Sequence, residues 1–417
     1  MGKTFAEKIL GTAAKKEVTA GDIVVVEPDF CMSHENASSI SRTFYTIGVE
    51  KVWDPEKIVI IFDHTVPAST ETYAASQKIT REFVARQGIR HFYDLNSRGG
   101  ICHQIMCQEG YAVPGTLIVG TDSHTCTHGA LGAFATGIGR TEMAAVWATG
   151  KIWLSVPESI RIYVDGHFAR GVYAKDLILK LIGDIHADGA DYKSVEFCGP
   201  AIHDMSIAER MTLCNMGIEM GAKNAVCPPD EKVQSYIASK SKLSGRKPIW
   251  ADERAHYNKE LHYCLDELTP GVAEPDRVDN YAPVKTVAGT RIDQAFIGTC
   301  TNARIEDLRI AAGILKGSHV AVRTIVVPAS VAVYERAIEE GLISIFLRAG
   351  CTVGHPGCGP CAGVAGGILA DGETVISTAN RNFKGRNGAR TSRIYLASPA
   401  TAAYSAIKGE ISDPSEF

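Results

Sequence analysis

Five short apolar segments of the chain share one feature, because each ends abruptly in polar residues that can take part in chemistry. The segments are 57–65 (KIVIIFDHT), 115–125 (GTLIVGTDSHT), 293–302 (DQAFIGTCTN), 323–330 (RTIVVPAS) and 374–382 (TVISTANRN). Continuous β-branched runs of this length are typical of buried strands in parallel sheets. The stretches between them have the composition of helices, at 74–87, 140–153, 303–315 and 330–342. We therefore expect an α/β fold.

The polar ends of these segments predict a shared site. In open α/β sheets, ligands bind beyond the carboxyl ends of the strands, so polar residues after several strands indicate one composite site. Each cluster by itself has a plainer explanation, since Asp, Ser, Thr and Asn are also the preferred residues at helix caps. The repetition of the pattern favours the shared site.

The length of 417 residues exceeds what one ordinary hydrophobic core supports, so we expect several domains. The stretch 157–284 has strand and helix signals of its own, and its charged, proline-containing end at 265–284 is typical of a linker. The expected α/β domains are 1–156, 157–284 and 285–417, the last of which carries the cysteines discussed below.

Composition excludes several classes of protein. The charges are balanced, with 43 Lys and Arg against 47 Asp and Glu, so we expect no nucleic-acid partner. The start of the chain (MGKTFAEKIL) carries charges where a secretory signal needs an apolar core, and no stretch reaches the about 18 apolar residues of a membrane span. We expect a cytoplasmic protein without a membrane partner, whose twelve cysteines are mostly reduced thiols.

Two cysteines stand three positions apart in the run HPGCGPCAG. Cys358 and Cys361 have the spacing of a redox dithiol, but that motif belongs near the start of a small domain. As a zinc site, the pair needs two further ligands. As an iron–sulfur site it needs only one, which Cys300 offers at the end of a predicted strand, with Cys351 and Cys126 in reserve. Three thiolates would leave one iron open to act as a Lewis acid, whereas electron-transfer clusters usually take four cysteines.

Acidic and imidazole side chains stand together at the predicted strand ends. Asp63 with His64, and Asp122 with His124, are pairs in which a carboxylate can orient an imidazole and fix its tautomer. His103 in GICHQ joins them if its helix faces the same cavity. A lone histidine is more often structural than catalytic, so the inference rests on the pairing.

Two arginines follow the last of the five segments, in NRNFKGRNG. Arg381 and Arg386 are five positions apart, so a turn has to bring their guanidinium groups together, and the forked geometry of that group suits carboxylates. We interpret them as ligands for a substrate carboxylate. A solvated surface loop is the alternative.

With these residues assembled, the sequence resembles the aconitase superfamily, and within it the large subunit of the two-subunit 3-isopropylmalate dehydratase and homoaconitase type. The motifs that carry the resemblance span nearly the whole chain in the family's order. They are DH at 63–64, GICHQ at 100–104, GTDSHT at 120–125, CNMGIEMGA at 214–222, GTCTN at 298–302, GCGPCAG at 357–363 and NRNFKGRNG at 380–388. The resemblance implies three α/β domains of the aconitase type around a central iron–sulfur site.

The resemblance also implies which residues do the chemistry. It implies a [4Fe–4S] cluster on Cys300, Cys358 and Cys361, whose open iron binds the hydroxyl and a carboxylate of a hydroxy di- or tricarboxylic acid. The implied residues for proton transfer and hydroxyl departure are Asp63, His64, His103, Asp122, His124 and Glu219. Those for substrate binding are Arg381, Arg386, Ser123 and His34, the last at a position where related enzymes carry Gln or His. Those that support the cluster or substrate are Asn215, Asn302 and Asn380.

One feature of single-chain aconitases has no counterpart among these motifs. Those enzymes carry a mobile fourth domain with a GSSRE-like serine that removes the Cα proton, and nothing after residue 388 resembles it. We expect the chain to be inactive alone. It should need a small subunit of about 160–200 residues, the size of one domain, that supplies this swivelling domain with its serine and a further arginine.

The implied activity is that of a hydro-lyase that dehydrates and then rehydrates its substrate. We expect it to interconvert 2-isopropylmalate and 3-isopropylmalate in leucine biosynthesis, because the two-subunit architecture and the short chain fit that branch. Homoaconitate and 2,3-dimethylmalate are alternative substrates. Two alternatives come from other classes: a zinc hydrolase that uses the same three cysteines, and a regulatory RNA-binding protein, which the mild negative charge disfavours.

Overall fold

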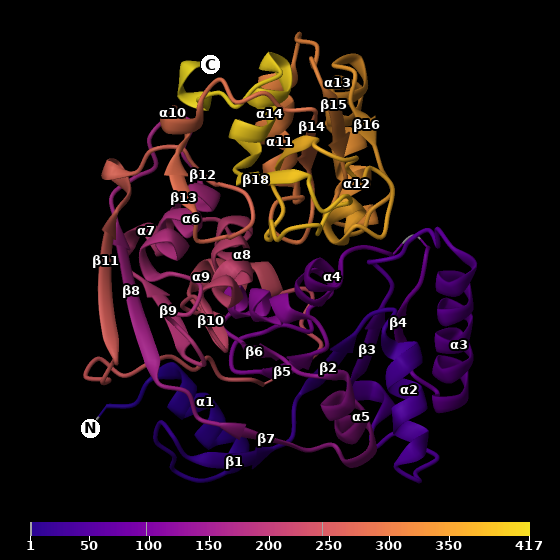
Figure 1. Ribbon diagram of the computed structural model, residues 1–417. Helices are drawn as coiled ribbons and strands as arrows, with labels where there is room; N and C mark the ends of the chain where they lie inside the picture. The colour runs from indigo at the N-terminus through magenta and orange to yellow at the C-terminus, as the bar shows by residue number, and fades with distance from the viewer. Residues whose placement is uncertain (1, 97, 244) are drawn as a thin grey trace.

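Three sheets organise the chain in the computed structural model, which describes residues 2–96, 98–243 and 245–417 (Figure 1). The sheet of the C-terminal part lies at the top of Figure 1, that of the N-terminal part at the lower right, and the third at the left. Helices pack around these sheets. The architecture is therefore α/β, as the strand and helix signals predict.

The N-terminal sheet consists of five parallel strands in the order β4-β3-β2-β5-β6. Its strands are β2 (Phe30–Ser33), β3 (Ile58–Ile61), β4 (His91–Tyr93), β5 (Leu117–Gly120) and β6 (Phe134–Gly137). The chain begins the sheet at β2, adds β3 and β4 on one side, and then adds β5 and β6 on the other. The strand order reverses between β2 and β5, and the crevice beyond the carboxyl ends at such a point is the usual place for a ligand.

The C-terminal sheet has seven strands in the order β13-β12-β18-β17-β14-β15-β16. Its strands are β12 (Gly271–Ala273), β13 (Tyr281–Pro283), β14 (Gln294–Ile297), β15 (Arg323–Val326), β16 (Thr352–Val353), β17 (Thr374–Ser377) and β18 (Arg393–Ala397). The five from β14 onward are parallel and repeat the winding of the N-terminal sheet, with β14 in the middle. A second reversal of strand order therefore lies between β14 and β17.

The third sheet is parallel and has the order β10-β9-β8-β11. Its strands are β8 (Ser159–Asp165), β9 (Ser194–Cys198), β10 (Asn224–Val226) and β11 (Lys259–Cys264). A separate antiparallel ribbon, at the bottom of Figure 1, is formed by β1 (Ile23–Val26) and β7 (Ile152–Ser155). One cluster of buried apolar side chains includes Met32, Ile162 and Phe296, one from each of the three sheets, so the sheets share a core.

Helices connect and cover these strands. The α-helices are α1 (Phe5–Ala14), α2 (Ala37–Thr46), α3 (Glu71–Gln87), α4 (Cys102–Gln108), α5 (Arg140–Thr149), α6 (Ala174–Ile185), α7 (Pro200–Asp204), α8 (Ile207–Met216), α9 (Glu231–Ile237), α10 (Val284–Val287), α11 (Ile305–Leu315), α12 (Val331–Glu339), α13 (Leu342–Arg348) and α14 (Pro399–Lys408). The 3-10 helices are η1 (Pro55–Lys57), η2 (Ser123–Leu131), η3 (Gly217–Met220), η4 (Leu265–Glu267), η5 (Gly359–Ala362) and η6 (Pro414–Glu416). Across the described ranges, none of the helices combines the length and the apolarity that crossing a bilayer takes.

The five predicted strands are present as β3, β5, β14, β15 and β17. The predicted helices are also present, as α3, α5, α11 and α12, but the one expected over 140–153 ends early. It ends at Thr149 because Gly150 takes a φ of 71°, a left-handed conformation that stops a helix, and the chain then continues into β7.

The prediction of a linker over 265–284 is wrong for two short segments, which are the strands β12 and β13. β12 and β13 lie within it, and β12 pairs with β18 in an antiparallel register, which places this stretch at the edge of the C-terminal sheet. Its proline and charged residues suit an edge, where one side of the strand makes no ladder bonds. The domain bounds 1–156, 157–284 and 285–417 stay a prediction.

The segment around Cys358 packs on the loop that follows β3. Cys358 N donates a hydrogen bond to Asp63 O at 2.9 Å. A Cβ on Gly357 would lie 2.9 Å from Asp63 O, and a Cβ on Gly363 would lie 2.7 Å from Arg386 O. Both glycines are therefore needed for close backbone packing, and the contact at Asp63 joins the C-terminal part of the chain to the N-terminal part.

Candidate active site

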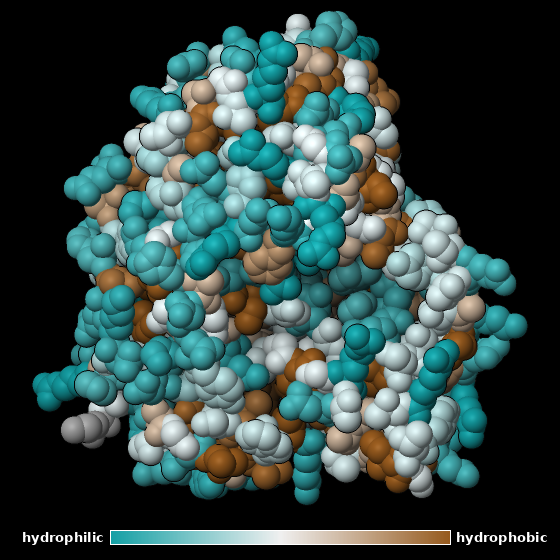
Figure 2. Space-filling view, in the orientation of Figure 1, coloured by the Kyte–Doolittle hydropathy of each residue, from teal (hydrophilic) through white to brown (hydrophobic). Residues whose placement is uncertain are grey.

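The predicted site residues lie where the two repeated windings meet. His34, Asp63 and Asp122 follow β2, β3 and β5 of the N-terminal sheet, while Cys300 and Asn380 follow β14 and β17 of the C-terminal sheet. The strands at both reversals of strand order thus contribute to one region. Figure 2 shows a hollow with mainly hydrophilic residues between the C-terminal part above and the N-terminal part below.

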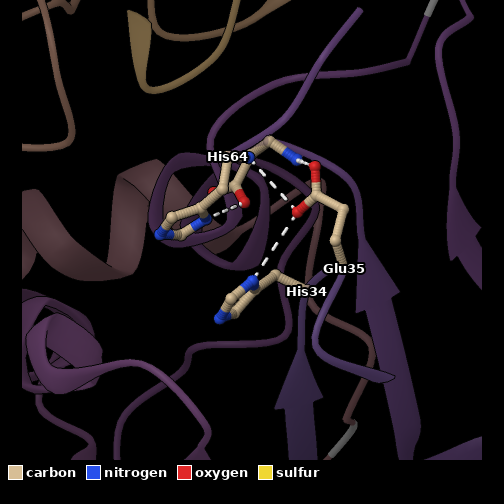
Figure 3. Close-up of side chains that lie close together, drawn as sticks. His34, Glu35 and His64 are labelled. Carbon is tan, nitrogen blue, oxygen red and sulfur yellow. Dashed lines mark hydrogen bonds and ion pairs between the residues drawn. The ribbon is translucent and has the colours of Figure 1, made fainter. Parts of the chain in front are cut away.

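Asp63 and His64 form an ion pair after β3. Asp63 Oδ1 and His64 Nδ1 are 2.6 Å apart, and Asp63 is almost fully buried. Burial raises the pKa of Asp63, but the charge and hydrogen bond of His64, the charge of His34 and the Cys102 amide together lower this pKa to about 2. Burial lowers the pKa of His64, but Asp63, Cys358 and Asp122 together hold this pKa well above its usual value. The His34 ring stacks on that of His64, with centroids 4.1 Å apart (Figure 3).

Asp122 contacts three histidines. Its Oδ1 lies 3.0 Å from His103 Nε2 and accepts a hydrogen bond from His124 N at 2.8 Å, and its Oδ2 lies 3.5 Å from His64 Nε2. Burial lowers the pKa of His103, but Asp122 raises it more strongly, to about 10. α4 therefore does direct His103 into the site. The nearest imidazole nitrogen to Asp122 is that of His103 rather than that of His124, whose Nδ1 lies at 3.5 Å.

Glu219 joins His124 to Arg381. Glu219 Oε1 lies 2.7 Å from His124 Nε2 and accepts a hydrogen bond from Arg381 Nε, also at 2.7 Å. Arg381 Nη1 donates to Ser123 Oγ at 3.4 Å. Burial raises the pKa of Glu219, but His124 and Arg381 together bring it below its usual value, so Glu219 is a carboxylate. Residues from η2, η3 and the loop after β17 thus form one connected chain of charges.

A cavity of about 540 Å³ opens beside this chain of charges. Its lining includes Asp122, Ser123, Arg381, Lys223 and Ile138. The volume suits a small organic molecule, and the two cationic side chains favour one that carries carboxylates.

Arg386 lies against the cysteine loop. Its Nη2 donates to Cys361 Sγ at 3.8 Å. Its Nε is buried and has no hydrogen-bond partner among the residues that the structure describes. A buried guanidinium N–H without a partner is costly unless a ligand accepts it, so the geometry fits a substrate-binding arginine.

Three thiols come together from two separate loops. Cys300 follows β14, Cys358 precedes η5, and Cys361 lies in η5. Asn380 links the loops, because its Nδ2 donates to Cys300 Sγ at 3.2 Å and its Oδ1 accepts from the Cys361 thiol at 3.8 Å. The Cys358 thiol donates to Asp63 Oδ2 at 3.8 Å. The Cys358 thiol therefore lies next to the ion pair of Asp63 and His64.

The acidity of Cys300 differs from that of the reserve candidates Cys126 and Cys351. Burial raises the pKa of Cys300, but His103 outweighs burial and lowers it to about 6. Burial and the nearby carboxylate hold the pKa of Cys358 well above its usual value, so a thiolate there needs a cation close by. Burial raises the pKa of Cys126 to about 12 and that of Cys351 to about 11, as expected for inert core thiols.

Two further asparagines differ in what they support. Asn215 Oδ1 accepts hydrogen bonds from Asn380 Nδ2 at 3.2 Å and from Thr301 Oγ1 at 3.0 Å, so it orients the amide that contacts the thiols. Asn302 Nδ2 donates to Asp307 Oδ1 at 2.9 Å instead. Asn302 therefore ties the loop after β14 to α11.

The chain is similar to known proteins. A model of the aconitase family (aconitate hydratase) matches residues 7–291 and 281–409, which is nearly the whole chain. The chain belongs to the aconitase family. The crystal structure of Thermococcus kodakaraensis aconitase X (holo-form) matches with a TM-score of 0.55 at 12% identity, covering 96% of this chain and 94% of that chain. This likeness supports the shared fold.

Two kinds of curated aconitase-family relative are equally similar. The chain is 52% identical over 420 residues to 3-isopropylmalate dehydratase large subunit 1 of Methanopyrus kandleri, which covers 100% of both chains. It is 52% identical over 392 residues to the probable methanogen homoaconitase large subunit of Methanosarcina mazei, which covers 94% of this chain and 99% of the relative.

Proteins of the aconitase family typically bind an iron–sulfur cluster, and the residues of this site fit one. Cys300 and Cys361 contact the Asn380 amide, and Cys358, three positions before Cys361, contacts Asp63. Cysteine thiolates are the ligands of iron in such clusters. The low pKa of Cys300, about 6, favours the thiolate that a metal needs. A cation close to the buried Cys358 would stabilise its thiolate form.

Two residues of this aconitase-family site were missed by the sequence analysis. Lys175, in α6, is fully buried and donates from Nζ to Thr378 O at 2.9 Å and to Ala379 O at 2.7 Å, directly before Asn380. Burial lowers the pKa of this lysine to about 7. Glu35 is the second such residue. Neither stands in a motif, since both act through backbone groups that are distant in sequence.

Proposed function

We propose that this chain is the large subunit of a two-subunit hydro-lyase that interconverts 2-isopropylmalate and 3-isopropylmalate by dehydration and rehydration. The observation that carries the proposal is the grouping of three thiols with charged histidine–carboxylate pairs and two arginines in one site. The full-length similarity to a 3-isopropylmalate dehydratase large subunit supports the same activity.

Cys300, Cys358 and Cys361 would hold a [4Fe–4S] cluster and leave one iron without a cysteine. When bound, the cluster supplies a Lewis acid that stabilises a leaving hydroxide. Asn380 contacts Cys300 and Cys361, and Asn215 bonds to Asn380. The two amides therefore hold the two cysteine loops next to each other.

The arginines would hold the substrate through its carboxylates. Arg386 has a buried Nε that bonds to none of the described residues, and Arg381 lines the cavity while Glu219 fixes its Nε. Ser123, whose Oγ accepts from Arg381 Nη1, can donate a further hydrogen bond to the same carboxylate. Two fixed contacts to one small acid keep its hydroxyl and its neighbouring C–H bond aligned for elimination.

Histidines would move the protons. In dehydration the C–O bond breaks, and the hydroxyl leaves as water after it takes a proton. His103 holds a proton for this step at neutral pH because Asp122 raises its pKa to about 10, against the opposing effect of burial. The electron pair of the neighbouring C–H bond forms the double bond, and rehydration reverses these steps at the adjacent carbon. His64, paired with Asp63 and close to Asp122, is the second proton carrier.

A small subunit would complete the site. The relatives named large subunits support such a partner, and we expect it to supply the base that takes the proton from the C–H bond. The side chains that select between substrates then lie partly on that partner.

The assay of a substrate panel tests the proposal. The chain is co-purified with its small subunit, loaded with iron and sulfide without oxygen, and offered 2-isopropylmalate, homoaconitate and 2,3-dimethylmalate. We expect the highest kcat/KM for 2-isopropylmalate and no turnover without the small subunit. Lack of activity toward all three acids would reject the hydro-lyase proposal.

Homoaconitase is the second candidate. The equal identity of 52% to a probable homoaconitase large subunit favours it, as does Lys223 in the cavity, because a further cation suits the third carboxylate of homoaconitate. A higher kcat/KM for homoaconitate than for 2-isopropylmalate would select this candidate.

A further inference from the structure

Glu35 is a buried carboxylate that stands directly after β2 and contacts the loop that follows β3. Its Oε1 accepts hydrogen bonds from Asp63 N at 3.1 Å and from Thr65 N at 2.8 Å, and its Oε2 accepts one from His64 N at 3.2 Å. The Thr65 hydroxyl donates to Oε1 at 3.2 Å. Figure 3 shows this carboxylate next to the backbone of His64, with the His34 ring on the other side. Three successive backbone amides of one loop thus converge on a single side chain.

A metal site is the competing explanation for this cluster. His34, Glu35, Asp63 and His64 each offer a ligand atom, and these atoms lie within 4.8 Å of one another. A carboxylate has about four lone-pair directions, however. Asp63 N, Thr65 N and the Thr65 hydroxyl point at Oε1, and His64 N points at Oε2, where His34 Nδ1 also lies 3.6 Å away. Contacts within the protein therefore account for both oxygens of Glu35.

The contacts of Glu35 determine where the catalytic pair points. Glu35 holds the loop that begins at Asp63 and includes His64. Asp63 Oδ1 and His64 Nδ1 in this loop lie 2.6 Å apart. The same loop accepts the hydrogen bond from Cys358 N through Asp63 O. Because backbone amides bonded to a buried charge resist displacement, the loop keeps one conformation.

We propose that Glu35 is a positioning residue that fixes the loop 63–65 and thereby aims the Asp63–His64 pair at the substrate. The inference rests on the proposed function for its catalytic consequence, although the fixing of the loop itself does not depend on it. Glu35 touches no reacting atom in this scheme and acts through Asp63 and His64.

The charge of Glu35 is needed as well as its shape. In Glu35→Gln, one of the two carboxylate oxygens becomes an NH₂ group, which donates and cannot accept from the amides that point at it. The variant thus loses the bonds on one side of the group and leaves one or two buried N–H groups unpaired. The loop can then move by fractions of an ångström, which matters for aligned proton transfer but not for binding through the arginines.

The test compares holoenzymes that carry Glu35→Gln and Glu196→Gln. Glu196 is a matched control, because it is also buried and accepts a hydrogen bond from a backbone amide, Phe5 N, at 2.9 Å, but on β9 and outside the site. Measurements are kcat and KM in the steady state, iron content, and amide hydrogen exchange of residues 63–65. For Glu35→Gln we expect kcat about 10- to 100-fold lower, KM within about twofold of wild type, unchanged iron content, and faster exchange confined to 63–65. Glu196→Gln should leave kcat and the exchange of 63–65 at wild-type values.

Several outcomes would overturn the inference. An unchanged kcat in Glu35→Gln, an equal loss of kcat in Glu196→Gln, or faster exchange spread over the whole chain would assign Glu35 to general stability. If Glu35→Gln does not fold, Thr65→Val is measured in its place, because this variant removes one hydrogen bond to Glu35 and keeps the charge of Glu35. We expect kcat to be about two- to fivefold lower and the exchange at 63–65 to be faster. Unchanged kcat and exchange would contradict the inference. Should the wild-type holoenzyme turn over none of the acids, the proposed function fails, and the exchange of 63–65 alone decides on Glu35.

Discussion

Replacement of Arg381 by lysine tests the carboxylate-binding role of the arginines. Arg381 Nε bonds Glu219 Oε1 at 2.7 Å while Nη1 reaches Ser123 Oγ at 3.4 Å. Its side chain is 19% exposed, so part of the guanidinium group faces the cavity that it lines. Lysine keeps the charge, but its single nitrogen cannot hold Glu219 and a substrate carboxylate in the same forked geometry.

The size of the effect follows from the bond that is lost. A hydrogen bond to a charged group contributes about 1.5–3 kcal/mol. Since 1.4 kcal/mol is about a factor of ten, KM should rise roughly 10- to 100-fold. The effect on kcat should be smaller, because His124 still holds Glu219 through a contact of 2.7 Å.

Steady-state kinetics of the reconstituted two-subunit enzyme measure this prediction. Arg336→Lys is the control, because Arg336 lies on the exposed face of α12, where it pairs with Glu340 at 2.6 Å. We expect the control to keep wild-type KM and kcat. If Arg381→Lys also keeps both values, the arginine does not bind substrate and the reasoning from the cavity is refuted.

Three other changes test buried polar residues of the chain, Lys175, Glu196 and Asn380. Lys175→Met should lower the free energy of unfolding by roughly 2–4 kcal/mol, since the carbonyls of Thr378 and Ala379 lose their buried donor; an unchanged denaturation midpoint would contradict this. The free energy of unfolding should fall by roughly 1–3 kcal/mol as pH rises from about 5 to about 7.5, because burial raises the pKa of Glu196 to about 7 and the unfolded chain releases that proton at lower pH. Denaturation at both pH values should show a flatter profile for Glu196→Gln, and an equally steep one would speak against the raised pKa. Asn380→Ala should reduce iron retention, because it removes the amide that contacts two of the thiols, and full iron content would rule out this supporting role.

The residues at the strand ends could be predicted from the sequence, because the apolar run and the polar residues that follow it are neighbours in the chain. Asp63, Asp122 and Cys300 stand directly after β-branched runs, and parallel strands end at the same edge of a sheet, so these side chains were expected to share a site. The order of the strands was not predictable from these runs. The two reversals that bring β2, β5, β14 and β17 to the site depend on packing between segments far apart in the chain.

The residues that were missed act through the backbone. Glu35 binds amides 28 to 30 positions away, and any residue other than proline could supply those amides, so the residue types give no signal. Lys175 lies in a helix whose apolar spacing is that of an ordinary amphipathic helix, and only the fold buries its ammonium group beside Asn380. Sequence spacing likewise paired Asp122 with His124, whereas α4 brings the ring of His103 closer.

Iron content after anaerobic loading, measured in single cysteine-to-serine variants, tests the central claim most directly. We expect Cys300→Ser, Cys358→Ser and Cys361→Ser each to lose the bound iron and the broad thiolate-to-iron absorption, while circular dichroism shows that the fold is retained. We expect Cys126→Ser and Cys351→Ser to keep both the iron and the absorption. Full iron retention in any of the first three variants, or tight stoichiometric zinc in place of iron in the wild-type chain, would contradict the account.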